Sequence, residues 1–353
     1  MKRFFAWAAA ATIIISLTSC GGKNIEVERI WDNGYSAFPS IVEFNGRYYV
    51  SCREAKSHIF DENGKADGKA RILVSRNGRR WKSAALLEKP GTDLRDPKLS
   101  VTPDGRLMVT MGGSVFEDKE CVSYFPQVAF SSDGKTFTDP SPVNFDENIT
   151  DNKEWIWRVT WHGGTGYGVT YGQHFALVKT TDGVNYTLVK ELGLDRTNFP
   201  GESTIRFGAD GRMYMMVRCD SGDCLGRWGW SDAPYTDWTW KDMDFHLGGP
   251  DFILLGDKVV AGSRYHFPGG KCRTMVLTGN LEGDFEERYL MPSGGDTSYP
   301  GFIDMGKELW MVYYSCHETA EGGSHGTIYD FDPNAKGAPK ASIYLARIPK
   351  SML

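Results

Sequence analysis

The chain has 353 residues, 41 of them glycine, with 13% aromatic residues and a formal net charge of −5. This length allows one large all-β domain or two small ones, and the glycine and aromatic content favours the single domain. A pI near 5.9 without runs of lysine or arginine argues against nucleic-acid binding, so we expect a neutral or mildly anionic partner.

The N-terminus has the features of an export signal. Met1, Lys2 and Arg3 form a basic start, and the apolar run that follows is shorter than the roughly 20 residues needed to span a bilayer. Leu17 to Cys20 resembles a lipobox, the site where a bacterial signal peptidase cuts before an acylated cysteine. An ordinary secretory signal with an incidental cysteine is the alternative.

We therefore expect residues 1–19 to be a lipoprotein signal peptide, residues 20–24 a tether lipidated at Cys20, and residues 25–353 the folded domain. The mature protein would be exported and lipid-anchored to the bacterial cell envelope. Past the signal, no apolar stretch is long enough to cross a membrane.

Six further cysteines remain in a compartment that permits disulfides. Cys219 and Cys224 are the pair that we expect to be bridged. The other four have no metal-ligand spacing, and both buried thiols and bridges stay open for them: Cys52, Cys121, Cys272 and Cys316.

One pattern recurs along the rest of the chain: a short apolar strand, a polar turn that usually contains glycine, and a second apolar strand. The copies begin at Pro39, Pro97, Arg158, Glu202, Pro250 and Tyr299. Their spacing of roughly 45–60 residues is the period of four-stranded propeller blades. The fold class predicted is therefore all-β, a six-bladed β-propeller in one domain.

A second signal lies between these hairpins. The seven-residue stretches from Ser75, Ser131 and Thr180 resemble the Asp-box, in which a Ser or Thr, an Asp and a Gly make a tight turn before an aromatic residue that packs inward. We expect them in the outer hairpins of the blades. The copy from Ser131 matches well, whereas the first has Asn77 in place of the aspartate.

The ring also has to close. Residues 25–31 form a predicted strand without a blade of its own, and residues 342–348 form the last strand of the chain. We expect the first of these to complete the final blade, because such closure removes a free sheet edge.

The start of the first strand and the end of the second lie side by side in an antiparallel hairpin, so all six starts and ends face one mouth. The residues at these positions are mostly charged or aromatic: Arg53, Glu54, His58, Arg95, Asp96, Arg158, His174, Glu202, Arg218, Asp251, Arg264, His266, Asp296, Tyr299, Tyr314 and His317. A binding or catalytic site at this mouth is one interpretation, and a salt-bridge network around the channel is the other. Arg95, beside Asp96, is expected to be a structural member.

With these motifs in place, the chain after the signal peptide resembles the sialidase superfamily. The resemblance implies that Tyr299 is the nucleophile and Glu202 its base, because a tyrosine is a poor nucleophile until a carboxylate takes its proton. It implies that Arg218 and Arg264 bind an acidic group of the sugar. Asp67, in the loop after the first hairpin, is the implied acid/base residue.

One position departs from that family. Sialidases begin the first blade with Phe-Arg-Ile-Pro, and this chain has Ser36, Ala37, Phe38 and Pro39, so Ala37 replaces the first carboxylate-binding arginine. Arg53 and Arg158 are the candidate substitutes; otherwise the sugar is a different acid or neutral. The other substrate-binding candidates are Glu54, His58, Asp96, His266, Asp296, Tyr314 and His317.

The prediction is therefore a sialidase-like exo-glycoside hydrolase acting on the terminal sugar of a glycan, as a monomer and without a cofactor. Three alternatives remain. The first is a non-catalytic glycan-binding lipoprotein. The second is a carboxylate-only glycosidase, since Arg95-Asp96-Pro97 resembles a motif of five-bladed fructan- and arabinan-cleaving enzymes. The third is a metal site built from His58, His266 and His317, although histidines that hydrogen-bond sugar hydroxyls are favoured over it.

Overall fold

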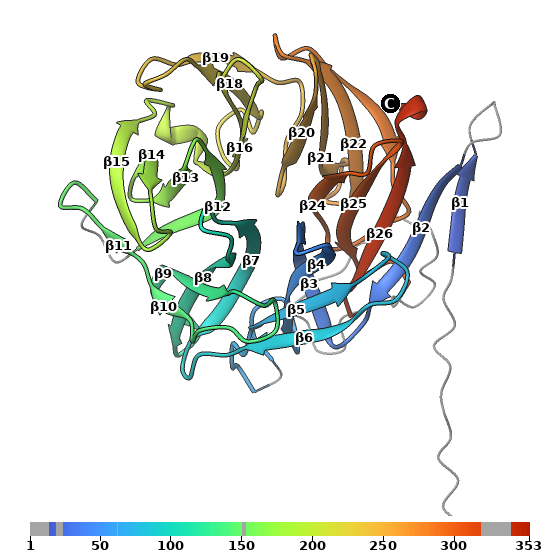
Figure 1. Cartoon of the computed structure of the whole chain (residues 1–353), viewed down its shortest axis with the longest axis horizontal. Coiled ribbons are helices and arrows are strands. Elements are labelled where there is room, and N and C mark those ends of the chain that lie inside the picture. Colours follow the sequence, from blue (N-terminus) through green and yellow to red (C-terminus); the bar gives the residue numbers. More distant parts are fainter. Residues whose placement is uncertain (1–13, 19–23, 62, 150–152, 319–339) are drawn as a thin grey trace, which may run out of the picture.

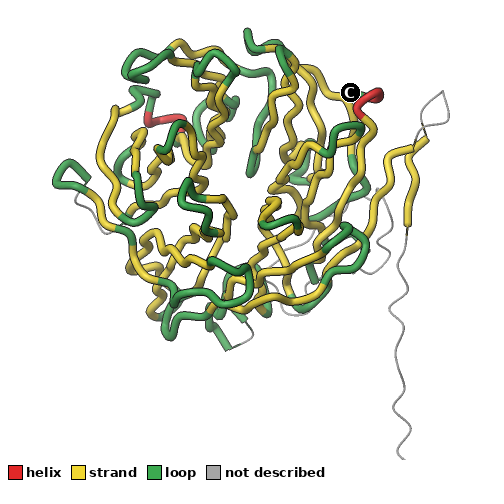
Figure 2. The backbone as a smooth tube through the Cα atoms, in the orientation of Figure 1, coloured by secondary structure: helices red, strands yellow, loops and turns green. Residues whose placement is uncertain are grey.

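The structure is a computed structural model that describes residues 14–18, 24–61, 63–149, 153–318 and 340–353. In Figure 1 six small sheets surround a central axis as a ring of blades. Figure 2 shows that strands and loops make up nearly all of the described chain, and the helical segments there are two short 3₁₀ turns, Arg196–Asn198 and Lys350–Met352. The six-bladed β-propeller predicted from the repeats is confirmed.

Each of the first five blades runs from an inner to an outer strand in chain order. Blade 1 is β3 (Tyr35–Phe44), β4 (Arg47–Ala55), β5 (Lys69–Ser75) and β6 (Lys82–Leu87). Blade 2 is β7 (Asp93–Val101), β8 (Leu107–Glu117), β9 (Glu120–Ser131) and β10 (Ser141–Pro142). Blade 3 is β12 (Glu154–His162), β13 (Thr165–Gly172), β14 (Phe175–Thr180) and β15 (Asn185–Glu191), with β11 (Asn144–Phe145) parallel to its outer edge.

Blades 4 and 5 repeat this order. Blade 4 is β16 (Pro200–Phe207), β17 (Met213–Cys219), β18 (Arg227–Ser231) and β19 (Thr239–Asp242). Blade 5 is β20 (Asp251–Leu255), β21 (Lys258–His266), β22 (Cys272–Asn280) and β23 (Phe285–Leu290).

Blade 6 is assembled from both ends of the chain. Its inner strands are β24 (Thr297–Asp304), β25 (Glu308–Ser315) and β26 (Ser342–Pro349), and β2 (Asn24–Trp31) pairs antiparallel with β26. The predicted closure by the N-terminal strand is confirmed. β1 (Ile14–Thr18), which lies within the predicted signal peptide, pairs with β2 at the outer edge, so removal of that peptide would leave β2 outermost. Cys20 lies outside the described residues.

The three seven-residue turns join the third and fourth strands of blades 1, 2 and 3. In each, the first residue's hydroxyl accepts the N–H of the glycine, as in Gly134 N to Ser131 Oγ at 2.8 Å. Asp133 and its equivalents accept the two N–H groups after the glycine. The three sequences therefore form the same turn in the outer hairpins, as expected.

The disulfide prediction is wrong. Cys219 and Cys224 are both free thiols, as are the other four cysteines within the described residues. Cys219 is 1% exposed and packs in an apolar cluster with Val217 and Tyr235, so the core holds its side chain in place of a bridge.

The described part of the chain also contains no helix with the length and apolar character needed to cross a membrane.

Candidate active site

The inner strands carry an irregularity at the mouth of the ring. In β3, β7, β12, β16 and β24 the register with the second strand shifts near the start, as between Ser298 and Gly301. Such bulges bend a strand and re-aim side chains. At three of them a non-glycine residue with a left-handed backbone precedes a proline: Phe38 (φ 59°), Asp96 (φ 46°) and Tyr299 (φ 54°). Left-handed backbone costs such residues about 1–3 kcal/mol, and strain of this kind gathers at functional sites.

Tyr299, Glu202 and Arg218 form a hydrogen-bonded triangle at this mouth. The Tyr299 hydroxyl donates to Glu202 Oε1, which is the contact predicted from the sequence. Arg218 Nη1 lies 2.8 Å from Glu202 Oε2 and 3.3 Å from the Tyr299 oxygen. Gly249 N donates to Glu202 Oε2 at 2.9 Å. The carboxylate is therefore fixed by three donors, from blade 4, from blade 6 and from the loop between blades 4 and 5.

The protonation states of this triangle follow from its surroundings. Burial acts to raise the pKa of Glu202, but Arg218 and the Tyr299 hydroxyl outweigh it, and the pKa lies below its usual value. Burial and the Glu202 carboxylate raise the pKa of Tyr299 well above its usual value. At neutral pH Glu202 is thus anionic and Tyr299 protonated, which is the pairing that a general base and a nucleophile require before reaction.

A second cluster centres on Asp296, which lies just before β24. Its carboxylate accepts hydrogen bonds from Tyr35 and Tyr314 (2.6 Å) and contacts His58 Nδ1 at 2.6 Å. Arg264 Nη2 lies 3.5 Å from Asp296 and 3.2 Å from the Tyr314 oxygen. Burial acts to raise the pKa of Asp296, but His58 and Arg264 hold it below its usual range.

Arg264 joins the two clusters. Its guanidinium carbon lies 5.8 Å from the centre of the Tyr299 ring, and its Nε donates to Thr297 O at 2.9 Å. Tyr314 also contacts the Tyr299 ring, at 5.8 Å between ring centres. The Arg264 and Arg218 side chains are 15% and 16% exposed, so both are partly accessible to solvent.

Asp96 is buried within the same region of the ring. Burial raises the pKa of its carboxyl and Glu202 adds to the rise, while Lys98 and Arg95 oppose it. A carboxyl with a raised pKa is suited to donate a proton.

Two arginines predicted to bind the substrate are buried and paired within the protein. Arg53 is 0% exposed, its Nε and Nη2 lie 3.1 and 2.7 Å from Asp93 Oδ1, and its Nη1 donates to Ser57 O. Arg158 donates to Pro300 O at 2.7 Å and contacts Asp251 at 3.5 Å. Both arginines brace the walls of the channel in this structure, and their proposed contact with substrate stays a prediction.

Four further candidates lie outside the two clusters. Glu54 is bonded to Arg71 by two hydrogen bonds of 2.9 and 2.7 Å. Asp67, in the loop between β4 and β5, accepts from Lys56 N at 3.2 Å. His266 stacks on His246 at 3.9 Å, and His317 is fully buried beside Ser315.

The histidine metal site gains no support from this geometry. His58, His266 and His317 each lie in different surroundings, and within the described residues no three His, Cys, Asp or Glu side chains are grouped to hold a metal ion. Burial lowers the pKa of His266 to about 3, so that its ring is neutral.

Sequence reasoning missed Tyr35, Lys98 and Trp157. Trp157 packs edge-on against the Tyr299 ring at 5.6 Å, and Lys98 lies on the ring's face. Two of the three are direct neighbours of predicted hairpin starts: Lys98 follows Pro97, and Trp157 precedes Arg158. Extending each start by one residue in both directions would have found them.

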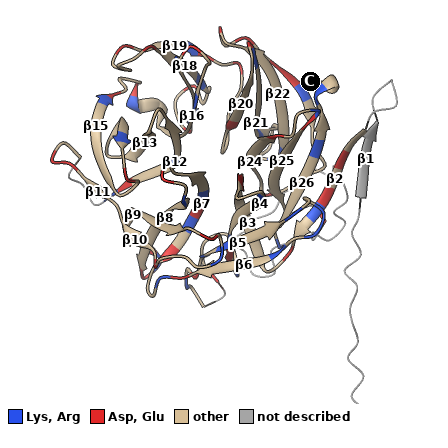
Figure 3. Cartoon of the chain, in the orientation of Figure 1, with Lys and Arg blue, Asp and Glu red and all other residues tan. Residues whose placement is uncertain are grey.

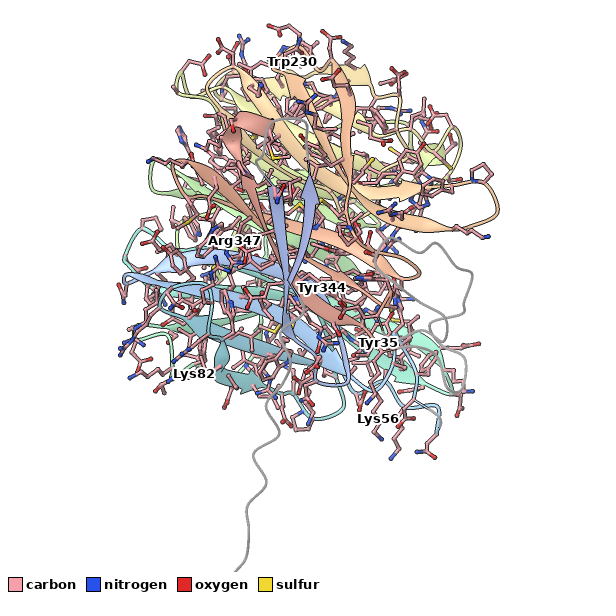
Figure 4. All side chains as sticks on the ribbon, turned by 90° about the vertical axis from the view of Figure 1, so that its right-hand side faces the viewer. Tyr35, Lys56, Lys82, Trp230, Tyr344 and Arg347 are labelled. Carbon is pink, nitrogen blue, oxygen red and sulfur yellow. The ribbon has the colours of Figure 1, made fainter. Side chains whose placement is uncertain are left out.

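Space for a larger ligand lies beside the mouth. A cavity of 680 Å³ between blades 1 and 2 is lined by residues that include Asn63, Lys65, Asp93 and Lys119. Figure 3 shows that the positions of acidic and basic residues are interspersed along the strands and loops of the ring. Figure 4 views the ring from the side: Tyr35 and Lys56 lie toward one face, and Lys82 and Arg347 toward the other.

No family model matches the sequence, and no curated protein matches it either. Solved structures do. A protein of unknown function from Dyadobacter fermentans matches over 92% of this chain and 99% of its own, at 16% identity and a TM-score of 0.69.

Two glycosidases are also similar. The Trypanosoma rangeli sialidase in complex with the inhibitor DANA matches 95% of this chain at 10% identity and a TM-score of 0.61, and this chain spans only 57% of its length. An α-L-arabinofuranosidase from Fusarium graminearum matches 90% of this chain and 96% of its own, at 14% identity and a TM-score of 0.62. The chain has the sialidase-like six-bladed propeller fold.

Proposed function

From this sialidase-like propeller and the contact between Tyr299 and Glu202, we propose that the protein is a retaining exo-glycosidase that removes a terminal sugar from a glycan. The observation that carries the proposal is the Tyr299, Glu202 and Arg218 triangle. In this triangle the Tyr299 hydroxyl donates its hydrogen bond to the Glu202 carboxylate, and the Arg218 guanidinium contacts both the carboxylate and the phenol oxygen. The two glycosidases of similar fold support the same reaction class.

In the first step the Tyr299 oxygen attacks the anomeric carbon and its proton passes to Glu202. The bond from that carbon to the leaving oxygen breaks, and an acid residue protonates this oxygen. Water then attacks the anomeric carbon of the tyrosyl intermediate and gives its proton to the same acid residue. The Tyr299 oxygen leaves and takes its proton back from Glu202.

Two residues are candidates for the acid that protonates the leaving oxygen. Asp67 is the residue that the resemblance implies, and it belongs to the loop between β4 and β5. Asp96 is supported by its burial and its raised pKa, which favour the protonated form. Asp96 is also the centre of the carboxylate-only alternative, in which Tyr299 takes no part.

Arg218 and Arg264 define the recognition that we propose. Two partly exposed guanidiniums beside the nucleophile suit an acidic group on the sugar, which they would hold by paired hydrogen bonds. Ala37 is fully buried and supplies no third cation. We therefore expect the best substrate to differ from an ordinary sialoside.

The test is a panel of aryl glycosides of sialic acid, related ulosonic acids, uronic acids and neutral sugars, with hydrolysis and binding measured on each. Turnover that is lost in Glu202→Gln supports the proposal, since the base is removed at constant size. Turnover that survives Glu202→Gln but is abolished by Asp96→Asn supports the carboxylate-only scheme. Binding without turnover across the panel supports a glycan-binding protein.

We further propose that the protein is exported and anchored through a lipid on Cys20, as its lipobox-like sequence implies. Metabolic labelling with a radioactive fatty acid tests this. The label should appear on the wild-type protein and be absent from Cys20→Ser, and equal labelling of both would contradict the proposal.

A further inference from the structure

A buried lysine lies directly under the proposed nucleophile. Lys98 follows the bulge of β7, two residues after Asp96, and is 2% exposed. Its Nζ donates to the carbonyl oxygens of Phe38 and Pro39 in blade 1, at 3.0 and 3.2 Å. These two bonds hold the head group of an otherwise flexible side chain at one point of the channel.

At that point Nζ lies between two aromatic rings. It is 5.2 Å from the centre of the Tyr299 ring and 5.1 Å from the centre of the Trp157 ring. An ammonium over a ring face is attracted by its quadrupole. Its attraction to the Tyr299 ring increases when that ring gains negative charge, so the contact is stronger in the transition state than in the resting state.

Resting on the proposed function, we propose that Lys98 is a positioning residue for the nucleophile: its ammonium holds the Tyr299 ring and stabilises the charge that the ring gains as its proton moves to Glu202. Arg218 contacts the phenol oxygen from one side and Lys98 the ring face from another. Lys98 touches neither the sugar nor the transferred proton in this scheme.

The charge of Lys98 depends on several groups around the channel. Burial and, to a lesser extent, Arg158 lower the pKa of Lys98 to about 7, against the opposing effect of Asp96, Glu202 and Asp251. Asp251 is itself paired with Arg206 at 2.6 Å. The cation is therefore present below neutral pH and lost above it, so activity should fall on the alkaline side as Lys98 loses its proton.

The experiment compares pH profiles of kcat/KM for wild type, Lys98→Met and Lys98→Arg on the best substrate of the panel. Lys98→Met should lose about tenfold or more at pH 6 and lose the alkaline fall near neutrality. Lys98→Arg keeps a charge that cannot be titrated, so its alkaline fall should move to higher pH. Lys241→Met, which removes an exposed lysine paired with Asp284, is the control and should keep the wild-type profile.

The outcomes separate the two proposals. Absence of hydrolysis by the wild type on every substrate overturns the proposed function and this inference with it. Hydrolysis with an unchanged pH profile in both Lys98 variants overturns this inference alone. If Lys98→Met does not fold, Lys98→Arg decides: an alkaline fall that stays in place contradicts the role of Lys98, and a shift to higher pH supports it.

Discussion

Tyr299 combines an unusual backbone conformation with a buried polar contact. Its backbone is left-handed at φ 54°, it precedes a proline, and its hydroxyl reaches a carboxylate in a different blade. A tyrosine in an ordinary strand position would keep its ring between sheets. The bulge in β24 turns this ring into the channel instead, where Phe38 packs on it at 4.9 Å.

The Asp296 cluster gives a pH-dependent prediction. Because the folded pKa of Asp296 is lower than the unfolded value of about 3.9, its contribution to stability is present above that value and is lost as the pH falls toward the folded pKa. Asp296→Asn should therefore lower the free energy of unfolding by about 1–3 kcal/mol at pH 7, and by less at pH 3. Urea denaturation at both pH values measures this.

Asp257→Asn is the matched control, since Asp257 is exposed in the turn between β20 and β21. It should change the urea midpoint little at either pH. An equal loss for Asp296→Asn at pH 7 and pH 3 would show that its carboxylate charge is not what stabilises the cluster.

Much of the site was predictable at the residue scale, because hairpin starts and ends share one face of the ring. The placement of Glu202, Arg218 and Tyr299 at one mouth follows from this rule, whereas the contact between Tyr299 and Glu202 was predicted from the resemblance to sialidases. The direction of each side chain does not follow. Successive side chains of a strand point to opposite faces, so in β4 Arg53 turns into the protein toward Asp93 and Glu54 turns to the other side, toward Arg71.

At the scale of elements, the seven-residue turns also pack one blade against the next. Gly78 has φ +70°, and a Cβ at this position would lie 2.1 Å from the Trp310 side chain in β25 of blade 6. Gly134 stands in the same relation to Tyr49 of blade 1. The glycine of this turn therefore serves both the turn itself and the contact with the neighbouring blade.

We predict that Gly78→Ala destabilises the protein more than Gly105→Ala. Gly105 has a similar φ of +77° but nothing within 4 Å of its Cβ position, so alanine there adds only the backbone cost of about 1 kcal/mol. Gly78→Ala should add a further 1–3 kcal/mol, roughly, for displacing Trp310. Thermal or urea unfolding compares the two, and equal losses would show that packing between these blades contributes nothing.

For the whole molecule, ring closure depends on a strand from the opposite end of the chain. β2 pairs with β26, and Arg347 contacts Glu28 at 3.0 Å and donates to Gly78 O at 2.6 Å. Blade 6 is thereby tied to its own outer strand and to the turn of blade 1. Closure of this kind leaves the ring without a weak edge between its first and last blades.

Val27→Asp tests the closure. Val27 is 1% exposed on β2, and a carboxylate there would be buried without a partner, so a loss of about 3 kcal/mol or more is expected. The control is Val122→Asp, since Val122 is 38% exposed on β9 and should change stability little. Urea midpoints that match for the two variants would mean that β2 is dispensable for the ring.

The ring itself was predictable because each blade repeats one hairpin pattern in phase with one kind of turn. The unpaired N-terminal strand and the last strand of the chain indicated the closure as well. The disulfide prediction was wrong because it relied on closeness in sequence alone. Cys219 is the last residue of β17 and Cys224 lies in the loop that follows, and both thiols are free.

The central claim is that Tyr299 is the nucleophile of a glycoside hydrolase, and Tyr299→Phe tests it most directly. The change removes one hydroxyl and keeps the ring between Phe38, Trp157 and Lys98, so folding and ground-state binding should be nearly intact. Turnover of the best substrate should fall by about a thousandfold or more, while the dissociation constant measured by calorimetry stays within about threefold. Turnover that persists in Tyr299→Phe at near the wild-type rate would contradict the account.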